Sequence, residues 1–147
     1  MTETALITLT EDELNTLVSI AIRRAEVFDD MDSPMASDAW HEVMVYEERI
    51  ARITRPEEIT GGVARVGAVR AALAAGQRLE AAHLASLYLA EDSLPPERRA
   101  AMERVFQLDR EHRARRFSAL ARTGRLAELD EWRAIASKNP RVFPLAA

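Results

Sequence analysis

The stretch GGVARVGAVRAALAAGQRLEAAHLASLYLA, from Gly61 to Ala90, decides the fold class. Alanine, valine and leucine recur through it with few charges, and Gly76 divides it into two segments of helical length. Small side chains let two helices approach closely, and glycine favours the left-handed conformation that often ends a helix. We therefore predict two short antiparallel helices, at about 63–75 and 78–91, joined at Gly76.

Two amphipathic helices are predicted before this stretch. Thr10 and Glu13 have the spacing of a capping box, and apolar residues follow at intervals of three and four up to Phe28. Ser33-Pro34 is typical of a second helix start, and an apolar stripe then continues to about Ile53. Residues 57–62 contain a Gly-Gly pair, and we interpret them as a connector or a single helical turn.

The sequence after the central stretch predicts one long helix and one short helix. The long helix begins at Pro95-Pro96 and runs to about Arg122, and a sixth helix spans about 126–136. Residues 109–116 are charged on every face of the long helix. Unpaired buried charge is costly, so we expect this part of the helix to be exposed.

These patterns predict an all-α fold, a helical bundle of five to six helices built from antiparallel helix hairpins. The length of 147 residues fits a single domain covering 1–147, with an N-terminal extension at 1–9 and a C-terminal tail at 141–147. Helix-forming leucine, alanine, arginine and glutamate are abundant, whereas aromatic residues make up 5% of the chain. This balance favours helices over strands.

The composition excludes several classes of site. The chain contains no cysteine, so it has no disulfide framework and no thiolate nucleophile or metal ligand. Its start lacks the pattern of a signal peptide, and no run of 18 residues is apolar and free of charge. The serines lack a nucleophile-elbow pattern, and no phosphate-binding loop follows a strand pattern. We expect a cytoplasmic protein without membrane association, cofactor or enzymatic activity.

The distribution of charge suggests a function in protein–protein interaction. Residues 1–60 carry 5 basic and 14 acidic side chains, 61–94 carry 3 and 3, and 95–147 carry 12 and 7. The three segments therefore have net charges of −9, 0 and +5. Such polarity favours pairing between or within chains. We predict a non-enzymatic adaptor that self-associates as a homo-oligomer or holds another protein, with these candidate contact residues: Arg110, Arg113, Arg115, Arg116, Glu47 and Glu48.

Two alternative functions use other side chains. Glu80 and His83 on one helix, with Asp109 and His112 on another, have the i,i+3 spacing of carboxylate and histidine ligands in metal-binding bundles. The order of the helices departs from that of such bundles, and the arginines beside His112 would repel a dication. The face from Arg110 to Arg116 could instead contact nucleic acid, although the chain as a whole is acidic.

A weak internal similarity links two of the predicted hairpins. ALAAGQRLEAAHLA from Ala72 and ALARTGRLAELDEW from Ala119 share a helix end, a glycine, an arginine and a leucine. The second segment resembles a tetratricopeptide hairpin, with Gly124 at the turn and Pro140 closing the unit. The spacing of 47 residues and the missing opening motif depart from that family, which favours generic helix hairpins.

Overall fold

A computed structural model describes residues 2–122 and 126–138, and every regular element in that part of the chain is a helix. The all-α fold predicted from the sequence is therefore confirmed. The helices are α1 (Glu3–Thr8), α2 (Glu11–Asp30), α3 (Ala36–Ile53), α4 (Ile59–Ala74), α5 (Arg78–Leu89), α6 (Pro96–Arg122) and α7 (Leu126–Lys138). The chain divides into two compact units inside α6: the first ends at Asp109 and the second begins at Arg110.

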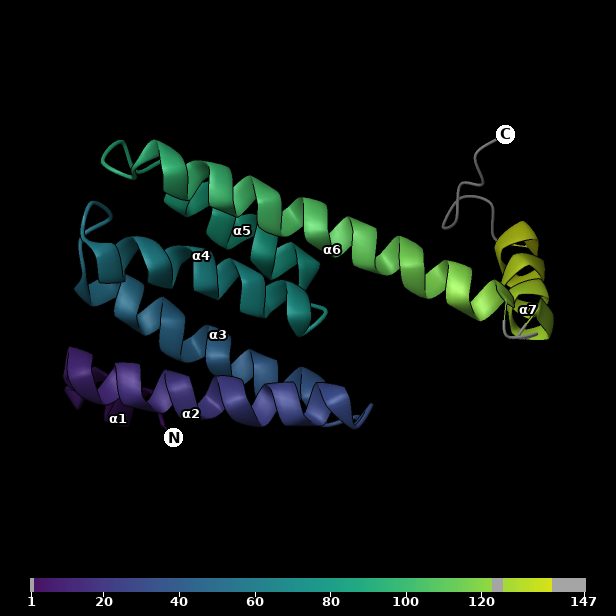
Figure 1. The fold of residues 1–147 in the computed structure, drawn as a ribbon, viewed down its shortest axis with the longest axis horizontal. Coiled ribbons are helices and arrows are strands. Elements are labelled where there is room, and N and C mark those ends of the chain that lie inside the picture. The colour runs from purple at the N-terminus through teal and green to yellow at the C-terminus, as the bar shows by residue number, and fades with distance from the viewer. Residues whose placement is uncertain (1, 123–125, 139–147) are drawn as a thin grey trace. The chain divides into compact units, whose positions relative to one another are not determined.

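In the first unit, α2, α3, α4 and α5 pack against one another in chain order. Figure 1 shows α2, α3 and α4 lying side by side, and the short α1 also contacts α3. This α1 occupies the residues that were expected to be an N-terminal extension, and the hydroxyl of Thr2 caps it by accepting a hydrogen bond from the Ala5 amide at 3.3 Å.

The start of α2 confirms the predicted capping box. The hydroxyl of Thr10 accepts a hydrogen bond from the Glu13 amide at 3.2 Å, and the Glu13 carboxylate accepts one from the Thr10 amide at 3.1 Å. The two bonds satisfy amide groups that have no partner inside the helix. The predicted apolar stripe of α2 faces the core, where Leu14, Val18, Ala21 and Ala25 are buried.

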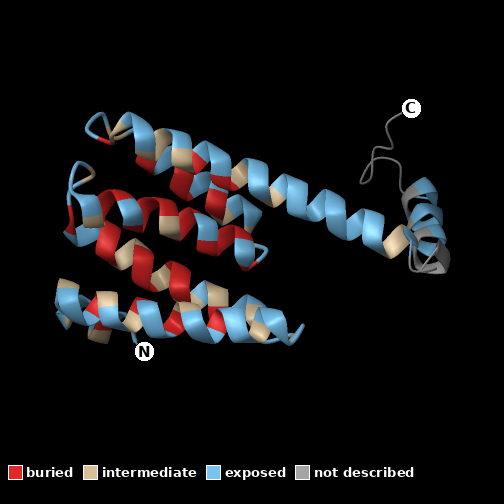
Figure 2. Ribbon diagram, in the orientation of Figure 1, coloured by how far each residue is buried: buried red, intermediate tan, exposed pale blue. Residues whose placement is uncertain are grey.

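Each of the longer helices of the first unit contributes to one hydrophobic core. Helix α4 is buried around most of its circumference, as the red ribbon in Figure 2 shows, because α3 and α5 cover two of its sides. Its alanines and glycines permit these close contacts. The largest fully buried side chains come from five helices: Leu14, Val43, Ile50, Val69, Leu84 and Met102.

Gly76 ends α4 in the left-handed conformation that the sequence predicts, with a φ of 75°. The Gly76 amide donates to the Leu73 carbonyl and the Gln77 amide donates to the Ala72 carbonyl, both at 2.9 Å. These two bonds form the Schellman motif, which satisfies the last carbonyl groups of a helix. The predicted hairpin of α4 and α5 is therefore present.

Two predicted helix starts are wrong. Helix α3 begins at Ala36 rather than at Pro34, and the Ser33 hydroxyl accepts a hydrogen bond from the Met35 amide before the helix begins. Helix α4 begins at Ile59 rather than at about Val63, so the Gly-Gly pair belongs to its first turn. A side chain on Gly61 would overlap the Arg55 carbonyl oxygen, which explains why a poor helix-forming residue occupies this position.

The second unit contains the C-terminal part of α6 and the predicted sixth helix, α7. Every residue from Arg110 to Ala119 is exposed, as expected from the charges on all faces of this segment. On α7, Arg133 lies 3.9 Å from the carboxylate of Asp130. The predicted stop at Gly124 and the tail at 141–147 lie outside the described residues.

Gly61→Ala should destabilise the protein by about 1–3 kcal/mol, because the added methyl group overlaps a backbone carbonyl that cannot move independently. Helix propensity alone predicts the opposite sign, a gain of roughly 1 kcal/mol. Gly62→Ala is the matched control, since its methyl group would meet only the flexible side chain of Arg98, at 3.0 Å. Urea unfolding measures both variants, and equal stability of the two would contradict the steric explanation.

Candidate functional site

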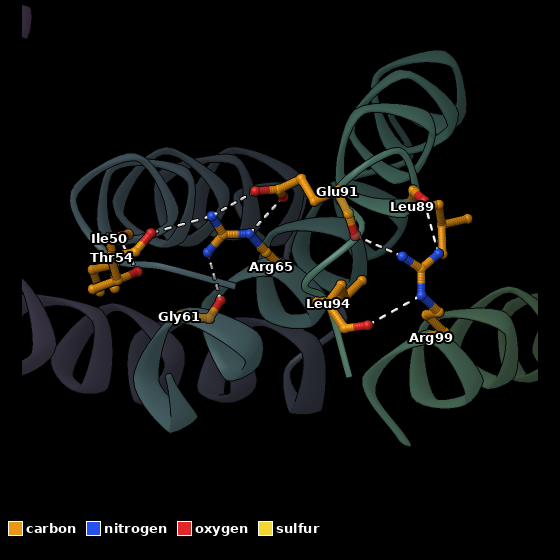
Figure 3. Close-up of polar contacts among 8 residues, drawn as sticks. All are labelled: Ile50, Thr54, Gly61, Arg65, Leu89, Glu91, Leu94 and Arg99. Carbon is orange, nitrogen blue, oxygen red and sulfur yellow. Dashed lines mark hydrogen bonds and ion pairs between the residues drawn. The ribbon is translucent and has the colours of Figure 1, made fainter. Parts of the chain in front are cut away.

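Arg65 on α4 is the centre of a buried polar cluster in the first unit. Its side chain is 5% exposed, and its Nε and Nη2 atoms donate to the two carboxylate oxygens of Glu91 at 2.7 and 3.0 Å. Nη1 donates to the Gly61 carbonyl at 2.9 Å, and Nη2 also donates to the Thr54 carbonyl at 3.2 Å (Figure 3). One guanidinium group therefore connects the residue after α3, the first turn of α4 and the residues after α5.

Arg99 on α6 extends this cluster through the loop between α5 and α6. Its guanidinium group donates to the carbonyls of Leu89 at 2.7 Å, Glu91 at 2.6 Å and Leu94 at 3.1 Å. Figure 3 shows Arg65 and Arg99 on either side of Glu91. Both arginines are bound by protein oxygens, so we interpret the cluster as structural rather than as a ligand site.

Arg65→Met should lower the free energy of unfolding by about 3 kcal/mol or more, because it leaves Glu91 and two carbonyl groups without their shared donor. Arg55→Met is the control, since Arg55 is highly exposed and forms surface ion pairs with its neighbours Glu57 and Glu58. Chemical denaturation of both variants tests this role. An Arg65 variant as stable as the Arg55 variant would show that the cluster is dispensable.

The two candidate contact residues Glu47 and Glu48 have different surroundings, although they are adjacent on α3. Glu47 is 7% exposed, and its carboxylate lies against Gly67 of α4, where an added Cβ atom would come within 2.5 Å of Oε1. Burial raises the pKa of Glu47 to about 7, against the opposing effect of the positive charge on Arg70. Because Glu47 is buried, we exclude it from the proposed contact surface.

Glu47→Gln should stabilise the protein more at pH 8 than at pH 5. Glu47 is protonated in both states below pH 4.5, but the folded protein retains the proton up to about pH 7. Stability contributed by the protonated group is therefore lost as the pH rises through this range, by about 3 kcal/mol in total. Glutamine is neutral at both pH values, so the difference from wild type in urea unfolding should grow with pH. A constant difference would contradict this burial effect.

Glu48 lies at the surface, where its carboxylate accepts a hydrogen bond from Arg52 at 2.6 Å. It also lines an open hollow of about 790 Å³ between α3 and the start of α5, to which Glu80 contributes as well. His41 lies at the same hollow and is 3.0 Å from the Gln77 side-chain oxygen. The hollow is open to solvent, unlike the enclosed pockets in which small-molecule ligands are typically buried.

The residues of the metal hypothesis are not brought together as a ligand set. His83 is exposed on α5, and the carboxylate of Asp109 lies 3.8 Å from Arg78. His112 is exposed on the part of α6 that belongs to the second unit. Within residues 2–122 and 126–138, no group of three His, Asp or Glu side chains could hold a metal ion.

The candidate arginines on α6 are all exposed. Arg110, Arg113 and Phe117 recur at intervals of three and four and therefore lie on one face of the helix, where Phe117 is 56% exposed. Arg115 lies on the opposite face, as does Arg122 seven residues later. The basic face that includes Phe117 thus combines positive charge with an exposed aromatic ring.

A second surface, which the sequence analysis missed, lies at the turn between α2 and α3. Val27, Met31 and Met35 are each more than half exposed there. The aspartates at positions 29, 30 and 32 are typical of a solvated turn, and the three apolar residues do not continue the buried stripe of α2 or α3. Apolar residues outside the buried stripes of α2 and α3 were the pattern in the sequence that could have identified this exposed surface.

Comparison with known proteins finds no matching family, no matching curated protein and no matching solved structure. None of the helices that the structure describes is both long enough and apolar enough to cross a membrane.

Proposed function

We propose that this protein is a non-enzymatic helical interaction module that self-associates through helices of complementary charge. The proposal rests on the unequal distribution of charge along the chain, with −9 in residues 1–60 and +5 in residues 95–147. The exposure of every residue from Arg110 to Ala119 supports it, because these arginines are accessible to a partner. Electrostatic complementarity of this kind increases the rate and the specificity of association.

The surroundings of the polar groups also support a binding function. The buried guanidinium of Arg65 is bound by oxygens of its own chain, and the carboxylate of Glu47 is enclosed against Gly67. Groups with these surroundings are enclosed by the bundle and do not face a substrate. The exposed charged helices remain as the candidate binding surfaces, and the absence of cysteine fits a reducing compartment such as the cytoplasm.

Sedimentation velocity at two salt concentrations tests self-association. We expect an oligomer at 50 mM salt and dissociation towards the monomer at 500 mM, because the Debye length falls from more than 10 Å to less than 5 Å over this range. A monomer at both concentrations, at protein concentrations up to about 100 μM, would refute the proposal. Binding of mixed-sequence duplex DNA under the same conditions would instead favour the nucleic-acid alternative.

A further inference from the structure

Several carboxylates lie at the C-terminal end of α2, where negative charge is least favourable in a helix. Asp29 and Asp30 lie in its last turn, which contains no basic residue, and the structure describes every residue of this helix. The C-terminus is the negative end of the helix dipole, so carboxylates are unfavourable there and cations are favourable. The Trp40 indole donates a hydrogen bond to Asp29 at 2.6 Å, but Asp30 and the following Asp32 are exposed.

Apolar side chains accompany these carboxylates. Val27 and Met31 are one helical turn apart, and the Met31 amide donates to the Val27 carbonyl at 3.1 Å. Their side chains are 54% and 69% exposed, and Met35 beyond the turn is 58% exposed. Exposed apolar side chains rimmed by charge are typical of a protein contact surface. We call this surface the acidic turn; it comprises Glu26, Val27, Asp30, Met31, Asp32 and Met35.

One face of α6 has the complementary chemistry. Between Arg110 and Arg122 the helix contains five arginines and one glutamate. Arg110, Arg113, Ala114 and Phe117 lie on a single face by their spacing, and all four are exposed. We call this set of four residues the basic face. It offers guanidinium groups, an aromatic ring and a small residue that permits close approach.

We propose that the basic face of α6 in one copy of the chain binds the acidic turn of a second copy. Arginine and carboxylate groups form strong charge-assisted hydrogen bonds, and methionine sulfur makes favourable contacts with aromatic rings such as that of Phe117. The cations would also reach the negative end of the α2 dipole. Each copy carries both surfaces, so the same contact can be made twice when two copies associate. This inference rests on the proposed self-association and identifies the surfaces that produce it.

Charge reversal on each surface tests the inference. The turn variant carries Glu26→Lys and Asp30→Lys, and the helix variant carries Arg110→Glu and Arg113→Glu. Each should weaken dimerisation at 50 mM salt by about 10-fold or more, because like charges replace attractive pairs. The variant with all four substitutions should dimerise again, since the complementary charges are exchanged between the two surfaces. Sedimentation velocity measures each dissociation constant, and circular dichroism checks the helix content.

Arg115→Glu with Arg122→Glu is the matched control. It changes the net charge from −4 to −8, as the helix variant does, but on the opposite face of α6. It should dimerise as wild type does. If wild type dimerises and the turn variant, the helix variant and the control behave alike, or if the fourfold variant remains monomeric, the assignment of surfaces is wrong. A wild-type monomer at both salt concentrations would instead refute self-association itself.

Discussion

The ion pair between Arg65 and Glu91 constrains the rest of the first unit. A guanidinium group that is 95% buried requires several acceptors, because desolvation of an unmatched charge would cost more than its packing contributes. Its partners come from three places along the chain: Thr54 after α3, Gly61 in α4 and Glu91 after α5. Binding all of them at once fixes the end of the bundle at which these segments meet. The apolar contacts along the helices then have one register in which both the core and the cluster are satisfied.

Small residues on α4 permit the close contacts of the bundle, and one of these contacts encloses the unfavourable carboxylate of Glu47. Gly61 allows the Arg55 carbonyl to approach the helix, and Gly67 leaves room for the Glu47 carboxylate. The same close contact removes water from that carboxylate and raises its pKa to about 7. The bundle is therefore held at one end by a buried charge that is paired and weakened in its middle by a carboxyl group that resists ionisation.

The sequence predicted those features that depend on local patterns. The capping box at Thr10, the turn at Gly76 and the exposed charged segment after Asp109 each follow from a few neighbouring residues, and all three are present. The burial of Glu47 and the bonds of Arg65 depend on residues far away in the chain, which periodicity cannot identify. The acidic turn was missed for a related reason, since its apolar residues belong to no buried stripe. The arginines of the candidate site follow from the composition of the sequence, whereas the acidic turn that we propose as their partner depends on which residues the fold leaves exposed.

Helix α6 contains both a buried apolar part and an exposed charged part. Met102 and Val105 are buried in the core of the first unit, and the exposed, arginine-rich segment begins at Arg110, five residues after Val105, without a break in the helix. Arginine, glutamate and alanine are good helix formers, so the segment can remain helical without apolar packing around it. Charges on every face contribute nothing to a hydrophobic core, and their mutual repulsion is unfavourable in an isolated chain. An acidic surface on a second copy would relieve that repulsion. We therefore attribute the retention of these destabilising charges to the proposed self-association.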